Sequence, residues 1–378
     1  MSQTILVTGL GDIGEHFVQF LSRYPDIGKI VACDLNPKKS VVVENAWSGA
    51  MHQGYNPEME FKQVDLFNIE KTTDLIKEVE PTAIFQCASV QSWWEIFTLR
   101  KEMTLKLLPS IVGGWLMMHV APTYSVMKAV KAAGLYGKIP VEIATLPDMT
   151  APALAKVGLA PTNGGGNAQL RIPRMKQIVS QELKVPVTAV EIWQVGEHGG
   201  IGTPEDPVPW WIKIEVNGED VTDKMGGAEG MRKRMARPYW DREPFPGVPH
   251  QQSTAACFLA NFIDVLYDRK HFVGTCCGVQ GLIGGYPVRL GRKVELALPK
   301  EISLAEAKKI NEEAARKSDA LETIKSDGTI VVTDACHKIL KEVFKFDHKE
   351  WGLEESVPLA LELTKKFREL QERERAYK

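Results

Sequence analysis

The sequence predicts an α/β protein with an N-terminal doubly wound parallel sheet and a C-terminal α+β domain. Strand-like and helix-like segments alternate through residues 4–145, which is the pattern of a parallel sheet with helices on both faces. After residue 148 the alternation stops, and a strand-like run at 210–216 ends in Asn217-Gly218, a strong hairpin signal. We therefore expect domains at 1–148 and 149–330 and a helical C-terminal extension at 331–378.

The elements of the first half follow from apolar, β-branched runs that alternate with segments of helical apolar spacing. Strands are expected at residues 4–8, 29–33, 60–64, 83–87 and 141–145. Helices are expected at 13–24 and 69–78, and a long helical region at 104–133 is interrupted by Gly113-Gly114 and by Pro122.

The second half is less regular. We expect helices at 174–183, 253–268, 304–324 and 354–373, and strands at 185–194 and 210–216. Residues 237–250 contain four prolines and are expected to form a long irregular crossing.

Composition and charge exclude several classes of function. The 378 residues carry 46 basic and 48 acidic side chains, so the chain lacks the basic surface typical of proteins that bind nucleic acid or anionic membranes. The longest apolar run, around 111–121, is shorter than the roughly 18 residues of a membrane span. The six cysteines lack metal-site spacing. With a strand beginning at residue 4 and no room for a signal peptide, we expect a cytoplasmic protein without a metal.

A glycine-rich turn between the first strand and the first helix predicts a dinucleotide site of the Rossmann type. Gly9 permits a tight turn, Gly11 admits a pyrophosphate, and Gly14 lets the helix pack closely on the strand. The acidic residue that such sites use on the ribose hydroxyls is Asp34, at the end of the next strand. It favours NAD, although Lys38 and Lys39 leave NADP open. The remaining expected cofactor contacts are Asp12, Ile13, Asp65 and Ala88.

A histidine among glycines is the strongest indication of chemistry. His198 follows the strand expected at 185–194, and Gly196, Gly199 and Gly200 would let the backbone turn sharply and a ligand approach the ring. Histidine readily exchanges a proton near neutral pH. The alternative is a histidine that merely caps a strand.

Three stretches of the second half resemble the lactate/malate dehydrogenase superfamily. Residues 195–200 with 207–211 look like its catalytic-histidine loop, residues 167–174 like its substrate-arginine helix, and residues 285–292 like its Val-Pro-x-x-Leu-Gly segment. With the N-terminal turn, the similarity spans roughly residues 4–325.

This resemblance implies an NAD-dependent oxidoreductase that acts on a small hydroxy or keto acid. It assigns proton transfer to His198, carboxylate binding to Arg174, and carbonyl polarisation to Arg100 on a mobile loop. The first domain would bind the cofactor and the second the substrate. It also implies a homodimer or homotetramer.

The chain departs from that family at the partner of the histidine. The family has an aspartate three residues before its substrate arginine, where this sequence has Arg171. A cation there would lower the pKa of His198, so we expect Asp148 or Glu197 to supply a carboxylate from another direction. Trp93-Trp94 also predicts a larger substrate or an aromatic lid.

Two other functions compete with this interpretation. The N-terminal half also resembles extended short-chain dehydrogenases and epimerases, and Tyr124 and Lys128 have the spacing of that family's catalytic Tyr-x-x-x-Lys pair. Alternatively, the missing aspartate indicates an NAD-binding sensor without redox chemistry.

Overall fold

A six-stranded parallel sheet forms the N-terminal part of the molecule. The computed structural model describes residues 2–235 and 248–375. The sheet order is β3-β2-β1-β4-β5-β6, and its strands are β1 (Gln3–Thr8), β2 (Ile27–Asp34), β3 (Glu58–Gln63), β4 (Ala83–Gln86), β5 (Val141–Ile143) and β6 (Asn163–Gly164). The expected doubly wound sheet is confirmed. Because β6 belongs to it, the sheet continues past the boundary expected at residue 148.

Helices cover both faces of this sheet. The helices of this part of the chain are α1 (Asp12–Leu21), α2 (Ser40–His52), α3 (Ile69–Val79), α4 (Lys101–Leu107), α5 (Ile111–Ala132) and α6 (Pro147–Lys156), of which the short α4 lies away from the sheet. Short 3-10 turns are η1 (Pro37–Lys39), η2 (Trp93–Thr98) and η3 (Leu108–Ser110). Helix α2 was not expected, since its Val41-Val42-Val43 run has poor helix propensity.

Helix α5 continues through the residues that were expected to interrupt it. Pro122 lies inside the helix and is buried. Gly113 and Gly114 instead let neighbouring segments approach: a Cβ on Gly113 would lie 2.8 Å from the backbone oxygen of Asp319, and one on Gly114 would lie 3.1 Å from Leu340. The two glycines therefore serve packing rather than helix termination.

Among its described residues, the second half contains two small antiparallel sheets and the helices α7 to α9. The sheets are β7 (Val190–Val195), β8 (Trp211–Val216) and β9 (Glu219–Asp220), and β10 (His271–Cys277), β11 (Gly285–Leu290) and β12 (Glu295–Leu296). The helices are α7 (Asn167–Leu183), α8 (Gly227–Met235) and α9 (Val248–Leu266), with η4 (Val187–Ala189) before β7. The predicted hairpin at Asn217-Gly218 is present, with positive φ at both residues. Most of the expected crossing at 237–250 lies outside the described residues.

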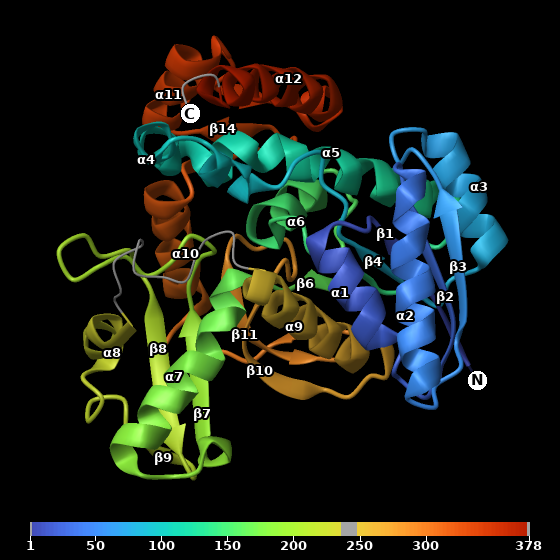
Figure 1. The fold of residues 1–378 in the computed structure, drawn as a ribbon. Coiled ribbons are helices and arrows are strands. Elements are labelled where there is room, and N and C mark those ends of the chain that lie inside the picture. The colour runs from blue at the N-terminus through green and yellow to red at the C-terminus, as the bar shows by residue number, and fades with distance from the viewer. Residues whose placement is uncertain (1, 236–247, 376–378) are drawn as a thin grey trace.

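An aromatic cluster joins the two halves. Phe17 of α1 and Phe85 of β4 stack with ring centroids 3.7 Å apart, and Phe258 and Phe262 of α9 pack against them. Helix α9, although late in the sequence, thus covers one face of the parallel sheet beside α1 (Figure 1).

The C-terminal part is not purely helical. It contains α10 (Leu304–Ser318), β13 (Leu321–Ile324), β14 (Ile330–Val332), α11 (Asp334–Phe344), β15 (Glu350–Trp351), η6 (Leu353–Glu355) and α12 (Ser356–Arg375), with β13, β14 and β15 in one antiparallel sheet. Helix α10 ends six residues before the expected position, because the chain turns at Asp319 and Ala320 into β13. In Figure 1, α11 and α12 lie over α5.

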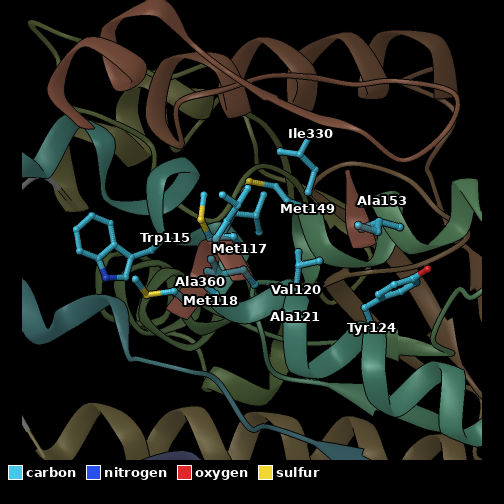
Figure 2. Packing of buried hydrophobic residues seen from close by; sticks show 14 of the residues in the cluster. Trp115, Met117, Met118, Val120, Ala121, Tyr124, Met149, Ala153, Ile330 and Ala360 are labelled. Carbon is cyan, nitrogen blue, oxygen red and sulfur yellow. The ribbon is translucent and has the colours of Figure 1, made fainter. Parts of the chain in front are cut away.

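Helix α5 is the centre of the largest hydrophobic core. Trp115, Met117, Met118, Val120 and Ala121 pack among side chains from α6, β14 and α12, with Tyr124 at the edge (Figure 2). The stretch Lys101–Ala132 is long and apolar enough to cross a membrane, but 72% of its most apolar window is buried in the fold. It is therefore a buried core helix.

Trp115 is the residue through which the C-terminal helices dock. Its fully buried ring meets Phe344 and Phe367 edge to face, at centroid distances of 5.9 and 5.6 Å. Replacing Trp115 with alanine removes these contacts and should lower the free energy of unfolding by about 3–5 kcal/mol. Chemical denaturation measures this, and a loss below about 1 kcal/mol would show that the helices are held elsewhere.

Candidate functional site

The turn after β1 has the geometry that a dinucleotide requires. Gly9 has φ +95°, and a Cβ there would lie 2.6 Å from the Ala88 backbone. A Cβ on Gly14 would lie 2.1 Å from the Gly9 carbonyl oxygen, so helix α1 packs directly against the turn. Gly11, by contrast, has nothing within 4 Å of its Cβ position among the described residues. This open side, at the N-terminus of α1, fits an anionic pyrophosphate.

Asp34 holds the turn from the end of β2. Its Oδ2 accepts a hydrogen bond from the Leu10 amide and its Oδ1 one from the Asn36 amide, both at 2.8 Å. A carboxylate oxygen can accept more than one hydrogen bond, so Asp34 can also accept bonds from ribose hydroxyls. The Nζ atom of Lys39 lies 3.9 Å from Oε2 of Glu15. One of the two lysines that could have bound the 2′-phosphate of NADP is therefore paired with a carboxylate.

The other expected cofactor residues lie at the same edge of the sheet. Asp12 is exposed in the first turn of α1, and Ile13 packs into the core beneath it. Asp65 follows β3 and accepts a hydrogen bond from Phe67, and Ala88 follows β4 in contact with Gly9. The structure therefore places all eight expected cofactor residues around the carboxyl ends of β1 to β4.

The His198 loop begins at the carboxyl end of β7 and is pinned to β11. The Gly285 amide donates to the Gly196 carbonyl at 2.9 Å. The His198 side chain is only 8% exposed, and its Nδ1 lies 3.9 Å from Oδ1 of Asp319, the residue that follows α10. Asp319 was not among the expected site residues.

Three fully buried acidic side chains gather around His198. Glu197 precedes it, Asp148 lies in the first turn of α6 just beyond β5, and Asp319 comes from the end of α10. Burial raises the pKa of Glu197 well above its usual range, and the charges of Asp148 and Asp319 add to this. Burial likewise raises the pKa of Asp148. Because Asp148 follows β5, the cluster sits at the carboxyl edge of the parallel sheet, as the cofactor turn does.

Arg171 points into this cluster from α7. Its Nη2 donates to the Glu197 carbonyl oxygen at 2.6 Å and lies 3.3 Å from the Cβ position of Gly196. A cation thus occupies the place that the resemblance assigns to an aspartate. Arg171 offsets part of the buried negative charge around it.

His198 keeps a raised pKa despite its burial. Burial is the largest effect and disfavours the charged imidazolium, but the nearby carboxylates of Asp319 and Asp148 together raise the pKa above its usual 6.5. Arg171 opposes them. By contrast, burial lowers the pKa of His119, on α5, to about 3, with the nearby His198 adding to the effect. His119 is therefore neutral near neutral pH.

The two expected substrate arginines lie outside the buried cluster. Arg174 is exposed on α7 and donates to Gln177 at 2.7 Å. Arg100 forms a two-pronged ion pair with the buried Glu374 of α12, at 2.6 and 3.0 Å. The segment around η2 is tied to the same helix, since Gln371 donates to Thr98 at 2.8 Å. The structure therefore does not bring either arginine into contact with His198.

Tyr124 and Lys128 are engaged with the C-terminal part of the chain. The Tyr124 hydroxyl donates to Glu354 at 2.7 Å, and Lys128 contacts the same carboxylate at 3.0 Å. Burial and the hydrogen bond to Glu354 raise the pKa of Tyr124 to about 12. Catalytic tyrosines of the Tyr-x-x-x-Lys type require the opposite change, so the geometry disfavours the epimerase-like alternative.

The described chain holds no cluster of three or more His, Cys, Asp or Glu side chains suited to a metal ion. Its six cysteines are free thiols. Cys277 is buried beside Asp148, and burial raises its pKa well above the usual range, which disfavours the thiolate form.

Comparisons with solved structures show which fold this is. Malate dehydrogenase from Picrophilus torridus superposes with a TM-score of 0.58 at 19% identity, over 84% of this chain and 97% of that one. Lactate dehydrogenase from Cryptosporidium parvum, solved with lactic acid and NAD, gives 0.59 at 17%, over 84% and 96%. Malate dehydrogenase from Plasmodium falciparum, solved with NADH, gives 0.55 at 15%, over 82% and 94%. The chain has the lactate/malate dehydrogenase fold and is a divergent example of it.

No family model and no curated protein sequence matches the chain. At 15–19% identity to these three structures, the likeness establishes the fold and leaves the chemistry to be argued from the site.

Tyr124 provides a test of the site assignment. Replacing it with phenylalanine removes the hydrogen bond to Glu354 and should lower the free energy of unfolding by about 1 kcal/mol while leaving NAD affinity unchanged. Denaturation and calorimetric titration with NAD measure the two effects. Loss of dehydrogenase activity at unchanged stability would support the epimerase-like alternative instead.

Proposed function

We propose that this protein is an NAD-dependent dehydrogenase of a 2-hydroxy acid, with His198 as the residue that exchanges a proton with the substrate. The observation that carries the proposal is a nearly buried histidine, paired with a carboxylate, at the carboxyl edge of a sheet with a dinucleotide turn. In doubly wound folds, ligands usually bind in a crevice at that edge of the sheet.

The chain's own residues would bind the cofactor as follows. Gly9, Gly11 and Gly14 accommodate the pyrophosphate at the start of α1, and Asp34 accepts the ribose hydroxyls. Asp34 also disfavours a 2′-phosphate by charge repulsion, which supports NAD over NADP. When bound, the nicotinamide supplies the hydride acceptor or donor.

His198 would act on the substrate oxygen. Because Nδ1 faces Asp319, we assign proton exchange to Nε2, which takes the hydroxyl proton during oxidation and returns it during reduction. The buried carboxylates around the ring stabilise its cation, which is the form required for carbonyl reduction.

Substrate binding is assigned to the two arginines that the family resemblance indicates, Arg174 and Arg100. Arg174 is exposed on α7, and its planar guanidinium suits a two-pronged contact with a carboxylate. Arg100 would polarise the carbonyl, and to do so it must exchange Glu374 for the substrate. Trp93 and Trp94, in the same segment, support a substrate larger than lactate. Assembly into a dimer or tetramer stays a prediction.

Replacing His198 with asparagine should remove proton transfer and lower kcat by roughly 10²- to 10⁴-fold, with NAD affinity unchanged. Absorbance of the reduced nicotinamide across a panel of 2-hydroxy acids provides the assay. His337, a surface histidine paired with Asp347, is the matched control, and its asparagine variant should keep full activity. NAD binding by the unmodified protein without turnover of any panel member would contradict catalysis and favour the sensor.

Replacing Arg174 with glutamine should weaken binding of the substrate carboxylate by about 2–5 kcal/mol, seen as a higher KM for the acid with the KM for NAD unchanged. Lysine should restore only part of the loss, since it lacks the planar fork. The exposed Arg289 on β11 serves as the control position. An unchanged KM for the acid would remove Arg174 from the site.

A further inference from the structure

The histidine of this site needs a carboxylate to orient its ring, and the position expected to supply one holds Arg171. We propose that Asp319, at the end of α10, is the positioning residue for His198. The carboxylate then comes from α10, while the position on α7 where the family resemblance places an aspartate holds the cation Arg171. This inference deepens the proposed function and rests on it for its catalytic meaning.

The contact between Asp319 and His198 is built into the packing. Both side chains are buried, and the 3.9 Å separation joins Oδ1 to Nδ1. A Cβ on Gly199 would lie only 2.2 Å from that same Oδ1, so the residue after His198 must be glycine for the carboxylate to approach. Gly113 of α5 likewise makes room for the backbone of Asp319. Two glycines on separate elements thus admit one aspartate.

The backbone fixes Asp319 at a helix terminus. Its amide donates to the Ala315 carbonyl, and the next residue, Ala320, has φ +59°. That conformation is unusual for alanine and persists only where surrounding structure imposes it. Thr333 imposes it here by donating its amide to the Ala320 carbonyl at 2.9 Å. The negative end of the α10 dipole then adds to the stabilisation of a protonated His198.

The neighbouring groups explain why Asp319 takes this role. The charged and titratable side chains that surround His198 are Asp148 of α6, Arg171 of α7, His119 of α5, Cys277 of β10, and Glu197 and Asp319. Asp148 lies in the first turn of α6 beside Cys277, where burial raises its pKa and so disfavours its charged form. Asp319 places a carboxylate oxygen 3.9 Å from Nδ1 of the imidazole.

The direct test is to measure the pKa of His198 by NMR titration of the protein without substrate. Asp319→Asn should lower that pKa by about one unit or more. Where a substrate is found, the loss of carbonyl reduction with rising pH should move to lower pH by the same amount, because the protonated imidazole is the reactive form. The KM for NAD should not change. Asp347→Asn is the control, and should alter only His337.

A rescue variant separates positioning from general stability. Adding Arg171→Asp to Asp319→Asn returns a carboxylate to α7 and should recover part of the His198 pKa. Because Asp319→Asn could unfold the chain, Gly199→Ala provides a second route: it keeps every titratable group but pushes the carboxylate away, and should also lower the pKa.

An unchanged His198 pKa in folded Asp319→Asn or Gly199→Ala protein would overturn the proposal. So would a lowered pKa with an unchanged pH profile of reduction. Absence of turnover with every hydroxy acid, by contrast, would refute the proposed function while leaving the NMR result to decide the role of Asp319.

Discussion

The contact between His198 and Asp319 connects three parts of the chain that are distant in sequence. The β7 loop presents the imidazole, α10 ends where it can present the carboxylate, and Gly113 of the core helix α5 accommodates the turn that follows. Each part is held by its own packing, so the contact costs little further ordering when a ligand binds. The cofactor turn lies at the same edge of the parallel sheet, which is why the arrangement suits hydride and proton transfer together.

The chain lacks the aspartate that the family resemblance places at position 171, but other acidic side chains surround His198. Burial and the acidic neighbours raise the pKa of Glu197 well above its usual range, and Arg171 offsets negative charge from the side of α7. Buried ion clusters of this kind gain little net stability over apolar packing. Their persistence in an otherwise apolar interior is therefore better explained by chemistry than by stability.

The parallel sheet could be predicted because most of its strands are short apolar runs between helices. The cofactor turn could be predicted because the spacing of its glycines is visible in the sequence itself. It missed α2, whose valine run has strand character. It missed Asp319 for a clear reason: α10 ends at Ser318, and the turn that follows has Ala320 in a left-handed conformation that normally requires glycine, so the helix was expected to continue to residue 324. An aspartate after Arg316 and Lys317, where helix ends favour cations, was the available signal.

If His198, oriented by Asp319, exchanges the proton with the substrate, its ring must face the nicotinamide. A crystal structure with NAD and a 2-oxo acid analogue tests it most directly. In that complex we expect the nicotinamide ring to lie against the imidazole, with Nδ1 facing Asp319 and Nε2 facing the oxygen of the analogue. A nicotinamide placed against Tyr124, or an imidazole turned away from Asp319 in the complex, would contradict it.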